Sequence, residues 1–163
     1  MATWAQFAQA APEMATLGLK LLKKFPGEEL RPEIAYLATV QEDGSPQVHP
    51  VCPVIAGEHL YVSIGPTSPK LRDLRTDGRY MIHALPGKDD AEFSVRGRAA
   101  EANDPATRSE VVAAAAACGL NIKEHEIVFR FDIERADTAY WENVGQPDTR
   151  PIRKRWEERR SPG

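Results

Sequence analysis

The residues best suited to chemistry lie in the segment YVSIGPTSPKLRDLR, residues 61–75. The pattern predicts a strand, a loop that contains Thr67 and Ser68, and a helix that begins just before Lys70. The backbone amides and the positive dipole end of a helix N-terminus favour an anion, and two hydroxyls and an ammonium group beside them can bind a phosphate. The same spacing is also that of an ordinary capped helix with a solvated basic face. The residues alone therefore leave two interpretations, a phosphate site and a structural helix start.

No other pattern in the chain predicts a catalytic centre. The sequence contains no GxSxG, P-loop, GxGxxG, CxxC or HExxH motif, so it predicts neither a nucleophile elbow nor a dedicated zinc site. The four histidines, His49, His59, His83 and His125, are scattered along the chain. We expect His49 and His83 to be hydrogen-bonded residues within strands, and the other two to face solvent beside turns. The sequence therefore predicts no metal site and no catalytic side chain.

Length and composition limit the class of protein. The chain has 163 residues, of which 42% are hydrophobic and 28% charged, and this predicts one globular domain over residues 1–163. No stretch approaches the ~18 apolar residues of a membrane-spanning helix, and the first residues do not resemble a signal peptide. The net charge of −3 gives no reason to expect a nucleic-acid partner. Cys52 and Cys118 are too few for a disulfide framework, so we expect reduced thiols and a cytoplasmic protein.

Helical segments are expected to cover a sheet and to position the candidate site. Residues 3–25 carry two apolar stripes at helical spacing, separated by Pro12, and these stripes are too narrow to form a core alone. Residues 69–76 are predicted to form a short helix with Ser68 as its N-cap. A further helix, rich in alanine, is predicted over residues 104–117.

The remaining segments have the alternation and the β-branched composition of strands. They cover residues 34–41, 46–55, 59–64, 79–85, 92–102, 126–135 and 138–143, with a final strand or extended arm at 150–158. The Asp43-Gly44 pair predicts a hairpin, and the connections are too short for parallel crossovers. We therefore predict a mainly β fold, a small antiparallel β-barrel with peripheral helices.

Prolines and one glycine mark unusual positions in these strands. Pro46, Pro50 and Pro53 each remove a backbone donor from residues 46–55, which predicts an edge strand, a bulge or a strand that faces a ligand. Gly97 interrupts the alternation of residues 92–102 and predicts a bulge.

The order and spacing of three segments resemble the FMN-binding split-barrel family, whose best-known member is pyridoxamine 5′-phosphate oxidase. The segments are ATVQEDGSPQVHPV, LYVSIGPTSPKLRDLRTDGRYMIH and FSVRGRAAE, and the resemblance covers residues 30–135. The proline after the first hairpin turn of the family matches Pro46. The family's Ser-x-Lys at the helix start matches Ser68 and Lys70, and its Arg-Gly in the fifth strand matches Arg96-Gly97.

This resemblance implies a homodimer of split β-barrels with FMN bound between the subunits. The phosphate-binding serine and lysine of the family carry over to Ser68 and Lys70, with Thr67 close by. The strand that lies along the isoalloxazine ring corresponds to Val48, His49, Pro50 and Val51, and Ser63 matches a position on the third strand that contacts the cofactor. A strand that faces a flat ring need not complete its hydrogen-bond ladder, which would explain why this strand tolerates Pro46, Pro50 and Pro53.

The chain departs from the oxidase itself at two places. The oxidase has an arginine at about Val48 and a C-terminal Arg-Leu-x-Pro signature, whereas this chain ends in RPIRKRWEERRSPG. We therefore do not expect it to oxidise pyridoxamine phosphate. We expect an FMN-binding oxidoreductase in which the flavin carries the hydride or electron pair.

Two alternatives keep the same fold. A deazaflavin-dependent reductase would need a wider basic groove, which Arg72, Arg75 and Arg79 could supply. A non-enzymatic carrier of haem or flavin could use His49 or His83 as an axial ligand of haem.

The C-terminal arm, residues 144–163, is strongly basic. We expect it to form part of the subunit interface, and a phosphate-binding tail is the alternative. Trp141 and Trp156 are expected to anchor the dimer interface, and the alternative is that they cap the flavin from the partner subunit.

Overall fold

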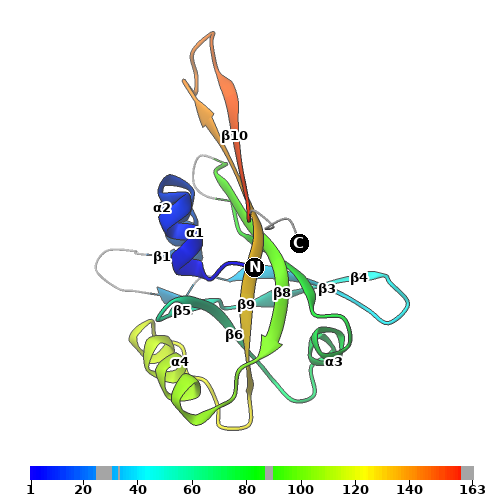
Figure 1. The fold of residues 1–163 in the computed structure, drawn as a ribbon. Coiled ribbons are helices and arrows are strands. Elements are labelled where there is room, and N and C mark those ends of the chain that lie inside the picture. The colour runs from blue at the N-terminus through cyan, green and yellow to red at the C-terminus, as the bar shows by residue number, and fades with distance from the viewer. Residues whose placement is uncertain (25–30, 33, 87–89, 159–163) are drawn as a thin grey trace.

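Two short helices open the chain, as its two apolar stripes predict. The computed structural model describes residues 1–24, 31–32, 34–86 and 90–158 (Figure 1). Helix α1 spans Trp4–Ala10 and helix α2 spans Pro12–Leu22, so the break falls at the predicted proline. A capping box starts α1: the Thr3 hydroxyl accepts a hydrogen bond from the Gln6 amide, and the Gln6 side chain accepts one from the Thr3 amide.

The predicted helical segment ends earlier than expected. After Leu22 the backbone forms the two-residue strand β1 (Lys23–Lys24), which pairs antiparallel with β2 (Arg31–Pro32). The last predicted helical residue and the Pro26-Gly27 stop lie outside the described residues.

The main sheet contains eight strands, and all their pairings are antiparallel. Its members are β3 (Ala35–Val40), β4 (Pro46–Val51), β5 (Val54–Ala56), β6 (His59–Ile64), β7 (Arg79–Ala84), β8 (Glu92–Glu101), β9 (Ile127–Glu142) and β10 (Arg150–Glu157). Their order is β4-β3-β7-β8-β9-β6-β5, and β10 pairs with β9. The strands β4 and β5 lie at opposite ends of this order although only two residues separate them. The sheet must therefore curl until its two edges meet, which makes it a barrel.

Two strand boundaries differ from the prediction. The expected strand 46–55 is divided at residues 52–53, and its two halves join opposite edges of the sheet. A proline lacks the donor that a continuous ladder needs, so Pro53 fits this break, and Pro46 and Pro50 lie in an edge strand as one of the alternatives predicted. The expected strands 126–135 and 138–143 are one continuous strand, β9, whose far half pairs with β10 in a hairpin that projects from the barrel (Figure 1).

The barrel interior is filled by large apolar side chains. Leu37, Leu60, Ile82 and Phe131 are fully buried there. Helices α1 and α2 cover one side of the barrel. Helix α4 (Pro105–Ala117), which Asp104 caps and which begins one residue after the predicted start, covers a second, smaller apolar cluster beside β5 and β6. Helix α3 (Pro69–Thr76) has the predicted bounds and packs against β3 and β8.

A bulge is present beside Gly97, but the bulged strand is β9 and not the predicted strand β8. Arg96 lies opposite Arg135 of β9 and Gly97 lies opposite Ile133, so Glu134 is the additional residue. A Cβ atom at position 97 would lie 2.0 Å from the backbone oxygen of Asp132. Only glycine permits this approach of the two strands.

We expect Gly97→Ala to lower the free energy of unfolding by about 3 kcal/mol, at the upper end of the cost of overpacking, because the atom it meets is backbone. Urea unfolding followed by circular dichroism would measure the change. Gly65→Ala is the matched control, since a Cβ there meets nothing within 4 Å, and it should change stability by less than about 0.5 kcal/mol. Equal effects of the two substitutions would contradict the role of the bulge.

Candidate functional site

The segment with the predicted phosphate-binding residues joins β6 to α3. Ser68 is the N-cap residue of α3 and Pro69 occupies the first turn, but the Ser68 hydroxyl makes no capping hydrogen bond. The predicted N-cap position of Ser68 is therefore confirmed, but its side chain does not cap the helix. The turn is held instead by the Ser68 amide, which donates to the Gly65 carbonyl at 3.0 Å. The hydroxyl of Ser68 consequently remains available to a ligand.

A groove of about 470 Å³ lies beside this helix start. Its polar lining comes from Thr67, Ser68, Arg72, Arg75 and Thr76. Arg75 is already paired, because its Nε lies 2.5 Å from Glu101 Oε1. Arg72 makes no such pair within the described ranges, so it contributes the uncompensated positive charge of the groove.

Lys70 lies on the other side of α3, toward the strands. Its side chain is partly buried, and burial lowers the pKa of its ammonium group. Lys70 also lies close enough to His49 of β4 to act on it electrostatically. The pKa of His49 is lowered first by burial and second by the charge of Lys70, while Asp73 opposes this shift. The structure thus brings together two of the predicted cofactor residues, one from α3 and one from β4.

The four predicted ring-facing residues of β4 divide between the two faces of the strand. Val48, which is 58% exposed, and Pro50 point outward, whereas His49 and the buried Val51 point toward the barrel interior. Ser63 of β6 is half-buried and lies on the strand face opposite the buried Val62 and Ile64. A cofactor along β4 would therefore contact the side chains of only one of these two sets.

Three polar residues near Lys70 were not predicted from the sequence. Asp73 of α3 is only 2% exposed, and its Oδ2 accepts a hydrogen bond of 2.7 Å from the hydroxyl of Thr39 on β3. Gln47 of β4 lies directly opposite Thr39 in the strand register. A signal was present, because Thr39 and Asp73 occupy positions where the periods of their strand and helix require apolar residues.

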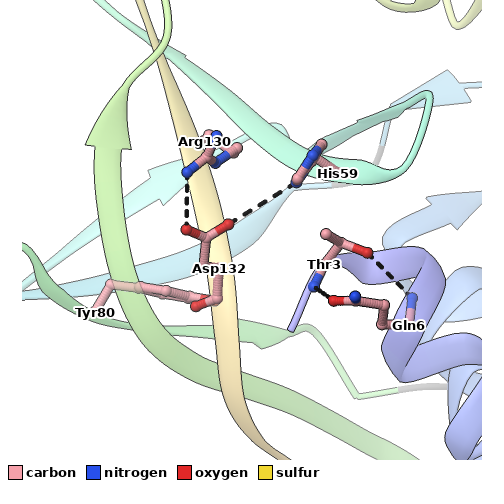
Figure 2. A network of polar contacts seen from close by, with 6 residues as sticks. All are labelled: Thr3, Gln6, His59, Tyr80, Arg130 and Asp132. Carbon is pink, nitrogen blue, oxygen red and sulfur yellow. Dashed lines mark hydrogen bonds and ion pairs between the residues drawn. The ribbon is translucent and has the colours of Figure 1, made fainter. Parts of the chain in front are cut away.

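A second polar network surrounds Asp132 of β9 and links it to neighbouring strands (Figure 2). Asp132 accepts a hydrogen bond of 3.0 Å from Arg130, and its other oxygen lies 3.8 Å from Nδ1 of His59. The hydroxyl of Tyr80 donates to the backbone oxygen of Asp132 at 3.3 Å. These contacts tie β6, β7 and β9 together. Within the described part of the chain, no group of His, Cys, Asp and Glu side chains could hold a metal ion.

The two candidate interface tryptophans have different surroundings. Trp156 packs within the chain, with its ring 5.2 Å from that of Phe7 on α1. Trp141 lies on the projecting hairpin and is 45% exposed. Trp141 is therefore the more accessible of the two to another molecule, because Trp156 is partly buried.

The outer face of β4, β3 and β7 exposes several large apolar side chains. Tyr36 lies opposite Pro50, while Val48 and Met81 both lie opposite Ala38. Tyr36, Val48 and Met81 are all exposed. Because paired residues share one face of a sheet, these side chains form one continuous apolar surface.

Comparisons with known proteins agree with this architecture. A family model described as Pyridoxamine 5′-phosphate oxidase matches residues 23–151. No curated protein matches the chain. Among the described residues, no helix is both long and apolar enough to cross a membrane.

Several solved structures share the fold at low sequence identity. A NimC/NimA family protein from Clostridium acetobutylicum is 17% identical, with a TM-score of 0.59 over 92% of this chain and 95% of its own. An F420 reductase is 20% identical, with a TM-score of 0.56 over 72% and 94% of the two chains. A haem-binding protein from Mycobacterium smegmatis is 20% identical, with a TM-score of 0.56 over 76% of this chain, which spans about half (52%) of that protein. These likenesses establish the predicted antiparallel split barrel.

The buried bond between Thr39 and Asp73 gives a first test of this site. We expect Thr39→Val to lower the free energy of unfolding by about 2 kcal/mol or more, because a buried carboxylate loses its hydrogen-bond donor. Thr39→Ser keeps the hydroxyl and should lose less than half as much. Urea unfolding at pH 7 measures both, and a Ser variant as unstable as the Val variant would show that the lost methyl group, not the hydrogen bond, decides the outcome.

Proposed function

The chain belongs to the pyridoxamine 5′-phosphate oxidase family, and on that premise we propose that it is an FMN-binding oxidoreductase. It would use bound flavin to transfer a hydride or an electron pair to or from a small molecule. The observation that carries this proposal is the start of α3, a helix N-terminus at which the hydroxyls of Thr67 and Ser68 line a groove together with Arg72, which is unpaired within the described ranges. Lys70 lies at the same helix start, on the side toward the strands. Oxidation of pyridoxamine phosphate is not part of the proposal, because Val48 stands where the oxidase has an arginine.

The residues at this site fit a phosphate ester. Ser68 and Thr67 offer hydroxyls that no cap consumes, and Lys70 offers an ammonium group without a partner in the described segments. These three residues would hold the phosphate, and β4 with Ser63 would lie along the rest of the cofactor. FMN, when bound, supplies the redox chemistry at its ring. The protein would bind and orient it, and no side chain need act as a general acid or base.

The basic residues favour FMN over a deazaflavin with a longer phosphorylated tail. Of the three arginines that could widen the groove, Arg75 is paired with Glu101, and Arg79 with Asp77 at 2.6 Å. The hydrogen bonds from Arg79 lower the pKa of Asp77 to about 2, so this pair is ionised under all physiological conditions. Arg72 alone is left for additional phosphate groups.

The absorption spectrum of the purified protein is the test of this proposal. Bound flavin, deazaflavin and haem absorb at different wavelengths, and mass spectrometry of the released ligand identifies it. A haem spectrum, or no affinity for added FMN, would overturn the proposal. Bound FMN that no reduced nicotinamide or other donor bleaches would make the protein a carrier and not an oxidoreductase.

We expect Lys70→Ala to weaken FMN binding about 30- to several-thousand-fold, because losing one member of a partly buried charged pair costs roughly 2–5 kcal/mol. Ser68→Ala should weaken binding less. It should also leave the free energy of unfolding almost unchanged, because the hydroxyl caps nothing. Fluorescence titration with FMN measures the affinities. Lys123→Ala, which removes an exposed lysine far along the chain, is the control for net charge.

We also propose that the protein is a homodimer that buries the outer face of β4, β3 and β7. A surface that exposes Tyr36, Val48 and Met81 side by side is costly in water, and a second copy of the same face can cover it. The projecting β9–β10 hairpin with the exposed Trp141 would add to this interface.

Met81→Glu should convert the dimer to a folded monomer, since the interface would bury two unpaired carboxylates. Light scattering at micromolar concentration measures the mass, and circular dichroism checks the fold. Val112→Glu places the same charge at an equally exposed apolar residue on α4 and should leave the dimer intact. A parent protein of 18.1 kDa in solution would contradict the dimer.

A further inference from the structure

Three buried polar atoms beneath α3 have no partner among the described residues. They are Oε1 of Gln47, Nε2 of His49 and Oδ1 of Asp73. Gln47 and His49 are alternate residues of β4 and share its inward face. Asp73 faces the same region from α3, because its other oxygen is bonded to Thr39, the residue opposite Gln47. An unpaired polar atom at such a depth is costly, so this cluster requires a donor.

Lys70 is the residue whose chemistry matches this requirement. It lies three positions before Asp73, and side chains at that spacing are neighbours on one face of a helix. Lys70 also lies near enough to His49 for its charge to lower the pKa of the imidazole. An ammonium group donates three hydrogen bonds and accepts none. The amide oxygen of Gln47, the carboxylate oxygen of Asp73 and the unprotonated ring nitrogen of His49 are three acceptors.

We propose that Gln47, His49 and Asp73 are positioning residues for Lys70, whose ammonium group makes no hydrogen bond in the described structure and can turn to these three acceptors when no external anion is bound. The lysine then has two alternative sets of partners. The inner set is this buried cluster, and the outer set is a phosphate at the start of α3. The exchange of Lys70 with an external phosphate rests on the proposed function, whereas its contact with the buried cluster does not.

The exchange between the two sets would determine how tightly the site binds an anion. An arriving phosphate must draw Lys70 away from acceptors that include a carboxylate, so part of the new interaction replaces an old one. Weakening the inner set should therefore expose the lysine and strengthen anion binding, which is the opposite of what damage to a binding site does.

Chemical labelling of Lys70 in the unliganded protein tests the inner set. A limiting amount of acetic anhydride modifies unprotonated, accessible amines, and peptide mass spectrometry reports the rate at Lys70 relative to the exposed Lys123. Gln47→Leu removes a neutral acceptor, so any change reflects a lost hydrogen bond and not a lost charge. We expect Lys70 to react about tenfold faster in this variant, the value of one hydrogen bond to a charged group. Gln47→Glu should make Lys70 react more slowly than in the parent.

The order of the three rates decides the inference. The contact is supported if Lys70 is labelled faster in Gln47→Leu and more slowly in Gln47→Glu than in the parent protein. Circular dichroism must show that all three proteins are folded. If Lys70 in Gln47→Leu is labelled at the parent rate or more slowly, the inference is overturned, and the buried acceptors are hydrogen-bonded by water instead of Lys70. Asp73→Asn is a second variant, because it keeps an acceptor for Thr39 while removing the carboxylate, and it should also accelerate labelling.

Sulfate, which carries two negative charges at neutral pH, separates the buried contact of Lys70 from its competition with an external anion. It should protect Lys70 from labelling, and in Gln47→Leu it should do so at a concentration several-fold lower than in the parent. If sulfate and FMN protect Lys70 in none of the variants while the order of rates holds, the buried contact stands and the proposed phosphate site fails. If sulfate protects Lys70 better in the parent than in Gln47→Leu, the buried cluster and the external anion do not compete for Lys70.

Discussion

The two-residue link between β4 and β5 is the constraint on which the rest of the structure depends. These strands occupy opposite ends of the sheet order, yet residues 52–53 are all that separates them. Three peptide steps span at most roughly 11 Å. The sheet therefore has to close on itself, with one face turned inward and one outward. Successive side chains of a strand point to opposite faces of the sheet, so this closure decides which of them lie in the core and which on the surface.

Closure also explains why a polar cluster exists at one end of the barrel. Toward the middle, the inward positions of β3 are apolar and fully buried, as Ala35 and Leu37 are. Near the hairpin the inward positions become Thr39 and Gln47, and α3 packs over them at this end of the barrel. The buried carboxylate of Asp73 is thus held between a helix and a strand, where it fixes α3 against the sheet. A helix held in this way presents its N-terminus, with Ser68 and Lys70, in one orientation.

Local features of the fold were predictable from the sequence, and non-local ones were not. The bounds of α3, the Asp104 cap and the bulge at Gly97 follow from residues within one turn or one strand of each other. The division of residues 46–55 depends on which edge each half joins, and that is decided by strands far along the chain. The site shows the same limit. The residue types at its helix start were recognisable, but the contact between Thr39 and Asp73 spans 34 positions and had only misplaced polarity as its signal.

Family membership narrows the chemistry without deciding the cofactor, and the side chains at the candidate site discriminate between haem and a phosphorylated cofactor. An imidazole can bind haem iron only through a ring nitrogen that is accessible and not already hydrogen-bonded. Here Nε2 of His49 is buried beneath α3, and Nδ1 of His83 already lies 2.6 Å from the carbonyl of Ala84. Burial, and after it the charge of Lys70, lower the pKa of His49, which suits a hydrogen-bond acceptor inside a polar cluster. A phosphate, by contrast, needs only hydroxyls, amides and a cation at a fixed helix start. Those groups are the ones that the closure of the barrel and the buried Asp73 hold in place.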